Sequence, residues 1–152
     1  MSLTNIRSQI KIVLDSVSGI GSTYDYKKFS NQWESYKDLF VKNSRVNTWE
    51  VQRNAFEIST KGSQARQGKV KGSIHSMVIR GFYSFVDNPS SEKEIDTLID
   101  SITDALMENQ DLNGSVEIIN VPITGTISFG FLGEVFCHIV EIDLNVQERT
   151  FL

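Results

Sequence analysis

The chain has 152 residues, of which 39% are hydrophobic and 22% are charged, so it has enough apolar material for one hydrophobic core. Its formal net charge of −4 argues against a surface that binds nucleic acid as a whole, although a local basic patch stays compatible with it. No apolar run approaches the roughly 18 residues of a membrane span, and the amphipathic N-terminus does not have the pattern of a secretory signal. We therefore expect a single domain over residues 1–152.

The N-terminal part of the chain predicts two helices. Apolar residues between Leu3 and Val17 recur at spacings of three and four, as on one face of an amphipathic helix, and Gly19 is expected to end that helix. A second and shorter helix is predicted after Ser30, with Trp33 on its apolar side.

The middle of the chain predicts two strands that flank a basic segment. Residues 46–58 alternate in polarity, with a shift near Asn54 that indicates a β-bulge, and residues 73–86 form a second strand with apolar side chains on both faces. The segment 59–73 between them carries four basic residues, three glycines and no acid. A connection of this length and composition is predicted to be a flexible basic loop.

The C-terminal half predicts a long helix and two more strands. Ser91 and Glu94 form a capping-box pattern that begins a helix, and Asn113-Gly114 is expected to end it. Residues 116–121 and 136–147 are predicted strands, the second with one buried and one mostly polar face. The predicted fold class is α+β: two layers, with a mainly antiparallel β-sheet of about four strands and helices packed on one face.

Few residues of the chain have the types and the spacing of a catalytic site. Cys137 is the only cysteine, which excludes an intrachain disulfide and is compatible with a reducing compartment. Cys137 and His138 are adjacent in a predicted strand, so they point to opposite faces and are poorly placed to share a metal. A nucleophile would require Cys137 paired with His75 across the sheet. Ordinary sheet residues are the preferred interpretation, and we expect no catalytic, cofactor or metal site.

Charge is distributed unevenly along the chain. Residues 91–111 hold seven acids and one lysine, and five of these acids step by four along the predicted helix. Like charges at that spacing cost a helix roughly 0.2–0.5 kcal/mol per pair. A solvated face accounts for this pattern, and so does a cationic partner such as the basic segment of a neighbouring copy. The candidate interface residues are Lys61, Arg66, Lys69, Lys71, Glu92, Asp96, Asp100, Asp104 and Glu108.

An aromatic stretch, Phe129 to Phe131, lies next to glycines near the C-terminus. Burial in the core is the preferred interpretation of these side chains, and an exposed patch for a partner is the alternative.

Several pieces in order along the chain resemble small morphogenesis proteins of tailed phages and prophages, of the tail-terminator, tail-completion or neck type. The pieces are Gly19-Ile20-Gly21, Tyr24-Asp25-Tyr26, Trp33, Trp49, Ile79-Arg80-Gly81-Phe82, Ser91-Glu92, Leu112-Asn113-Gly114, Leu132-Gly133, Cys137-His138-Ile139-Val140-Glu141 and Gln147-Glu148. Lys27-Lys28 departs from the pattern, since an arginine is expected there.

The resemblance implies a structural virion protein with no enzymatic activity. Such proteins form a ring, often hexameric, that ends the tail tube and offers a docking surface to the head-tail connector. The implied partners are further copies of the chain, the tail tube protein, the connector, and DNA that passes through the lumen. The implied location is the virion tail, after assembly in the cytoplasm of the bacterial host. The alternatives are a neck or head-completion protein, a small nucleic-acid-binding module that uses the 59–73 loop, and a small enzyme that uses His75 or Cys137.

Overall fold

A computed structural model of the chain describes residues 3–27, 41–42, 45–61, 70–86, 90–114, 116 and 118–151. The second predicted helix, with Trp33, lies outside these residues. The described elements are α1 (Leu3–Asp15), β1 (Ser22–Tyr24), β2 (Val41–Lys42), β3 (Arg45–Lys61), β4 (Val70–Ser84), α3 (Ser91–Glu108), β5 (Ile118–Ile119), β6 (Thr124–Leu132) and β7 (Val135–Phe151).

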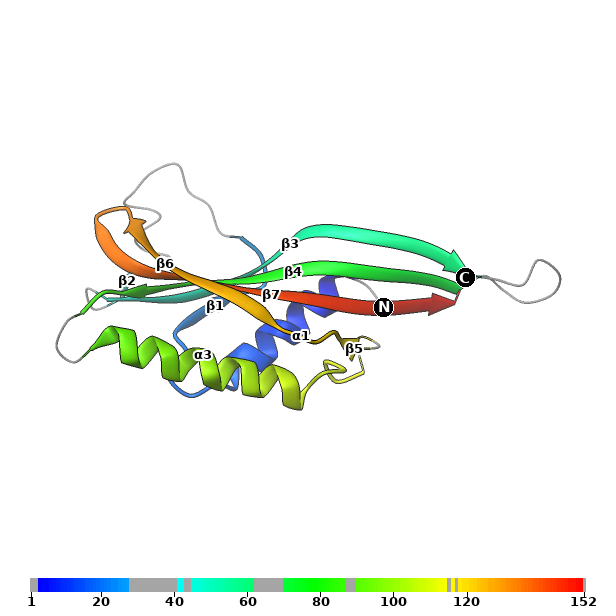
Figure 1. Cartoon of the computed structure of the whole chain (residues 1–152), viewed down its shortest axis with the longest axis horizontal. Coiled ribbons are helices and arrows are strands. Elements are labelled where there is room, and N and C mark those ends of the chain that lie inside the picture. The colour runs from blue at the N-terminus through cyan, green and yellow to red at the C-terminus, as the bar shows by residue number, and fades with distance from the viewer. Residues whose placement is uncertain are drawn as a thin grey trace.

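One curled sheet holds all of the described strands (Figure 1). Its order is β1-β3-β4-β7-β5, with β2 added beside β3 and β6 beside β7, and every pairing is antiparallel except that of β1 with β3. The predicted α+β class is confirmed, but the sheet has seven strands where about four are predicted. The prediction omitted β6 as well as the short β1 and β2.

Both described helices pack on the same face of the sheet, which we call the helix face (Figure 1). The apolar stripes of α1 and α3 are buried against inward-pointing strand residues in a single core cluster. The main members of that cluster are Ile6, Ile10, Leu14, Trp49, Val51, Met77, Ile79, Ile95, Ile102, Leu106, Ile142 and Leu144. A smaller cluster on the opposite face gathers Val46, Phe82, Leu132 and Cys137.

The β-bulge predicted near Asn54 is confirmed. Arg53 lies opposite Met77 and Ala55 opposite Ser76, so Asn54 is the extra residue in β3. Because directly opposed residues of neighbouring strands share a face, the bulge turns Phe56, which lies opposite His75, toward the helix face. Ile58 follows two residues later on the same face.

Trp49 occupies the centre of the core because a glycine lies opposite it. Trp49 is fully buried, and its cross-strand partner is Gly81. A Cβ atom on Gly81 would lie 2.3 Å from Cζ3 of the indole. The indole N–H donates a 2.8 Å hydrogen bond to Oδ1 of Asn47. The large aromatic ring and the missing side chain thus form a matched pair.

The segment 59–73 is not a loop throughout. Strands β3 and β4 continue into it from both sides, with Ser59 opposite Gly72, Thr60 opposite Lys71 and Lys61 opposite Val70. This part of the prediction is corrected, because hydrogen bonding with β7 on the far side of β4 extends the sheet as far as Val70. Residues 62–69, with Arg66 and Lys69, lie outside the described part of the chain.

Candidate interaction surfaces

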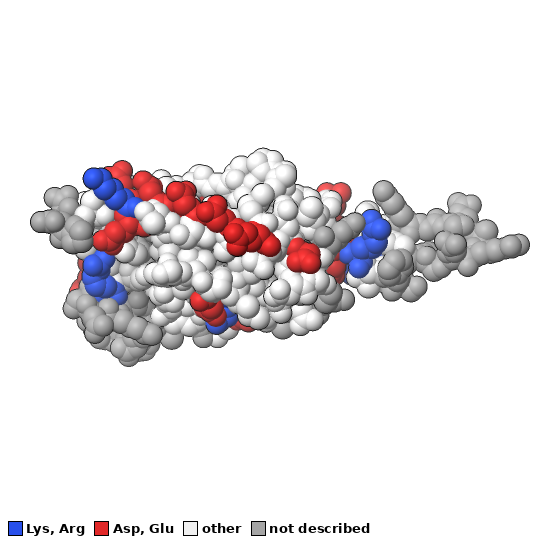
Figure 2. Space-filling view, turned by 90° about the horizontal axis from the view of Figure 1, so that it is seen from below, with Lys and Arg blue, Asp and Glu red and all other residues white. Residues whose placement is uncertain are grey.

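The five acids predicted to form a stripe all lie on the exposed side of α3. Figure 2 shows acidic side chains forming a band across this face of the molecule. Within the described part of the chain, the ion pairs are Lys11–Asp15, Arg45–Glu94 and Arg80–Glu141, and none involves the stripe. A cationic neighbour would reduce the repulsion among the carboxylates of the stripe. The members of the stripe are Glu92, Asp96, Asp100, Asp104 and Glu108.

Lys71, the one predicted basic residue whose side chain the structure describes, does not lie at the start of the acidic stripe. Lys71 is half-buried in β4, opposite Thr60 and Thr150, at the end of the sheet where β7 finishes. The helix α3 begins at the other end of β4, where Tyr83 donates a hydrogen bond to Glu94. The side chain of Lys61 and the whole of Arg66 and Lys69 lie outside the part of the chain that the structure describes.

Four phenylalanines form an exposed aromatic patch, a term we keep for Phe85, Phe129, Phe131 and Phe136. Their exposed fractions are 43%, 55%, 71% and 38%. The rings of Phe129 and Phe136 are stacked with centroids 5.7 Å apart, and Phe131 lies 5.1 Å from Phe136. The preferred expectation, burial of the 129–131 stretch in the core, is therefore wrong. An apolar cluster exposed on a strand surface is typical of a contact site for another protein.

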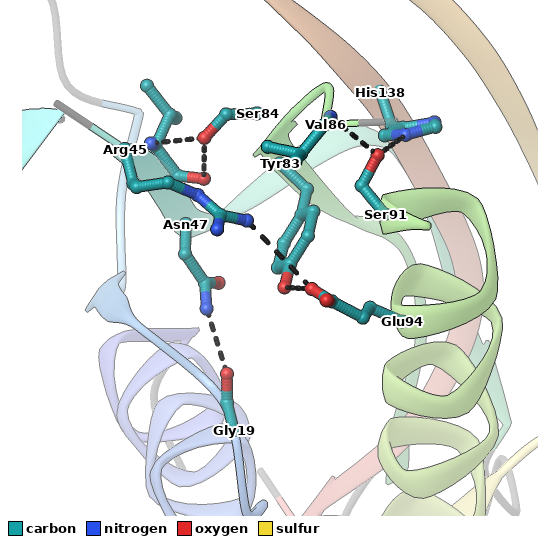
Figure 3. A network of polar contacts seen from close by, with 10 residues as sticks. Gly19, Arg45, Asn47, Tyr83, Ser84, Val86, Ser91, Glu94 and His138 are labelled. Atoms are coloured by element: carbon teal, nitrogen blue, oxygen red, sulfur yellow. Dashed lines mark hydrogen bonds and ion pairs between the residues drawn. The ribbon is translucent and has the colours of Figure 1, made fainter. Parts of the chain in front are cut away.

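A buried serine–histidine contact, drawn in Figure 3, lies next to the aromatic patch. Ser91 Oγ lies 2.8 Å from Nε2 of His138 and accepts a 2.9 Å hydrogen bond from the backbone N–H of Val86. The His138 ring lies 5.0 Å from that of Phe129 and 5.5 Å from that of Phe85. The contact therefore links the first turn of α3, the end of β4 and β7 next to the patch.

The capping-box pattern predicted that Ser91 caps α3, and this prediction is wrong. The capping residue is Ser90, which makes no side-chain capping hydrogen bond, and Ser91 is fully buried inside the first turn. The Glu94 carboxylate turns instead to the sheet, where it accepts the hydrogen bond of Tyr83 and lies 3.9 Å from Nη2 of Arg45 (Figure 3). These contacts fix the start of α3 on the sheet.

The polar groups with catalytic potential are enclosed or far apart. Cys137 lies opposite Ser84 and His75 opposite Val146, so the two side chains point to opposite faces. Ser84 and His75 are nine positions apart along β4, which separates them by roughly 30 Å. The proposed Cys137–His75 pair is thus excluded by the register of the sheet.

Burial governs the protonation of these groups. It raises the pKa of the Cys137 thiol to about 11, which disfavours a reactive thiolate. Burial lowers the pKa of His138 below its ordinary value, against the opposing effect of Glu92 and Asp96. Because Ser91 and His138 are 0% and 1% exposed, their contact is a structural bond that substrate does not reach.

No family model of known proteins matches the chain, and no curated protein sequence matches it. Among the described residues, no group of three or more His, Cys, Asp or Glu side chains is arranged to hold a metal ion. The helices in the described ranges are too short or too polar to span a membrane.

The sequence predicts the acidic stripe, but it gives exposure of the aromatic patch only as the alternative to burial in the core. The stripe follows from a spacing of four in a helix. The aromatic patch depends on β6, whose alternation of Ile127, Phe129 and Phe131 with small residues is visible in the sequence as a strand signal. The glycines at 125 and 130 obscured that signal.

Proposed function

We propose that this chain is a structural component of a phage or prophage tail, a tail-terminator-like protein that forms a ring at the end of the tail tube. The observation that carries the proposal is the exposed aromatic patch beside the acidic stripe of α3. Such a combination suits a protein contact, in which apolar side chains supply affinity and charges at the rim set orientation.

The proposal assigns the chain a role in assembly with no chemical step. The enclosed Ser91–His138 contact and the buried Cys137 support this assignment, because each group serves packing. The proposed partners are further copies of the chain, the tail tube protein and the head-tail connector, with DNA in the lumen. The proposed location is the virion tail, and the host cytoplasm during assembly.

Electron microscopy and sedimentation velocity test the proposal directly. Purified protein examined over a wide range of concentrations, with and without tail tubes from a tailed phage, should give closed rings or capped tube ends. Protein that stays monomeric and leaves tube ends uncapped at every concentration would refute it.

A charge-reversal pair sharpens this test. Asp100→Lys combined with Asp104→Lys reverses two charges of the stripe and should weaken ring formation, while Asp143→Lys reverses an exposed charge on β7 and serves as the control. The stripe variant should be at least as stable as the wild type, because it relieves like-charge repulsion along α3. Reduced assembly without reduced stability is the expected outcome.

A further inference from the structure

The sheet has two long edges without a neighbouring strand in the described part of the chain. One is β6, which pairs with β7 and with no other described strand. The other is the outer edge of β3 from Gln52 to Lys61, because β1 and β2 cover β3 only as far as Glu50 and Arg7 donates a hydrogen bond to the carbonyl of Val51. Both segments are mostly exposed. Unpaired backbone N–H and C=O groups along such edges are templates for adding a strand.

The edge of β6 lacks the features by which proteins usually prevent strand addition. The strand runs over nine residues, TGTISFGFL, with no charged residue and no proline. Ile127, Phe129 and Phe131 are 51%, 55% and 71% exposed, and all point to the helix face because they lie opposite Val140, His138 and Phe136. An uncharged, exposed edge of this kind gains from a partner strand.

The outer edge of β3 carries a matching row on the same face. Phe56 and Ile58 are 59% and 49% exposed and point to the helix face, as the bulge at Asn54 requires. Arg53 lies on that face too, with its guanidinium 4.7 Å from the centroid of the Phe56 ring. The open part of β3 is longer than the nine residues of β6.

We infer that β6 of one copy pairs antiparallel with the outer edge of β3 of a second copy, so that one sheet continues from subunit to subunit. This inference rests on the self-association in the proposed function and names the surfaces that form it. Strands β3, β4, β7 and β6 alternate in direction, so β3 and β6 run oppositely. A second copy in the same orientation therefore presents β3 antiparallel to β6, with both apolar rows on one face.

Charge selects β3, and not a second β6, as the occupant. A groove of about 190 Å³ between α3 and β6 is lined by Ile99 and Thr103 of the helix. Asp96, Asp100 and Asp104 are one helical turn or less from these two residues, so the stripe borders the groove. Pairing of β6 with β6 would bring two acidic stripes together, whereas β3 brings Arg53.

The contact joins two different surfaces, so it does not close on itself in a dimer but forms a ring or a filament. Strand β6 pairs with the half of β7 that runs from Val135 to Asp143, while the open edge of β3 lies level with the other half. Successive copies are therefore staggered along the strands, and closed sheets require such a stagger.

Lysine substitutions on the two rows test the inference, since a lysine on an edge strand opposes pairing. Ile127→Lys on β6 and Ile58→Lys on β3 should each raise the protein concentration needed for half-maximal association by at least about tenfold. Ile12→Lys on α1 is the matched control, because Ile12 and Ile127 are each 51% exposed, and it should change that concentration by less than about twofold. Circular dichroism and urea unfolding verify that each variant is folded.

Mixing the two edge variants distinguishes the inferred contact from other arrangements. Ile127→Lys keeps an intact β3 edge and Ile58→Lys keeps an intact β6 edge, so a 1:1 mixture should form heterodimers, which sedimentation velocity detects. Association of Ile58→Lys alone at the wild-type concentration would show pairing of β6 with β6 and would overturn the inference. Rings that persist in both variants would overturn it while leaving the proposed function intact, and a wild type that never associates would overturn both.

Discussion

The contact between Trp49 and Gly81 gives a sharp test of the packing at the core. Replacing Gly81 with Ala places a Cβ atom 2.3 to 2.6 Å from three atoms of the indole ring. Real Cβ atoms do not approach other atoms so closely, and Trp49 is fully buried, so either the ring or strand β4 must shift. Overpacking of this kind costs about 1–3 kcal/mol in the free energy of unfolding.

Gly72 provides the control on the same strand. A Cβ at Gly72 lies 3.4 Å from Oγ of Ser59, which is ordinary contact. Gly72→Ala should therefore leave stability within about 0.5 kcal/mol of wild type or raise it slightly, because alanine restricts the unfolded chain. Urea-induced unfolding, followed by Trp fluorescence and far-UV circular dichroism, gives both free energies.

A double-mutant cycle identifies the source of the cost. In a Trp49→Leu background the indole is absent, so Gly81→Ala should cost much less than in the wild-type background. The same cost in both backgrounds, or equal costs for Gly81→Ala and Gly72→Ala, would refute the proposed packing of Trp49 against Gly81.

Three further predictions concern the buried polar groups. Ser91→Ala should lower the free energy of unfolding by about 1–3 kcal/mol, because the buried N–H of Val86 and the ring of His138 each lose a hydrogen bond. Ser90→Ala should lower it by less than about 0.5 kcal/mol, since the Ser90 side chain makes no capping hydrogen bond. Equal costs of the two substitutions in denaturant unfolding would contradict this prediction. Folded protein at about pH 8 should alkylate Cys137 far more slowly than unfolded protein, because burial raises the pKa of the thiol to about 11, and equal rates by mass spectrometry would contradict it. Burial lowers the pKa of His138 below 6.5, so the unfolded state binds more protons than the folded state as the pH falls through 6.5. The free energy of unfolding should therefore fall with pH by up to about 1.4 kcal/mol per pH unit. Urea unfolding of His138→Gln should show a weaker dependence on pH, and an equal dependence would count against this role of His138.

The elements with regular hydrophobic periodicity are those that the sequence predicts well. The apolar stripe from Ile95 to Leu106 predicts α3, and the alternation in the final strand predicts its buried and polar faces. The bulge at Asn54 is also predictable, because the parity of the apolar residues changes there. In each case a local pattern determines which side of the element meets the core.

Features that depend on distant neighbours were not predictable from local patterns. Ser91 has the sequence of a capping residue, yet His138, far along the chain, draws its hydroxyl group into the interior. Phe131 is apolar and next to a glycine, which favours burial in the core, yet β6 lies at the edge of the sheet and leaves the ring 71% exposed. How exposed a side chain on an edge strand is depends on whether another element packs beside that edge. The sequence of the strand itself does not carry this information.

The acidic stripe and the apolar rows have different roles in the inferred contact. Exposed charges are screened by salt and contribute little each, so the stripe mainly sets the direction in which a second copy approaches. The rows on β6 and β3 are adjacent to backbone groups that gain hydrogen bonds, so they provide affinity and register. Raising the salt concentration should therefore slow association more than it speeds dissociation. A dissociation rate that rises steeply with salt would show that charge, and not strand pairing, holds the subunits together.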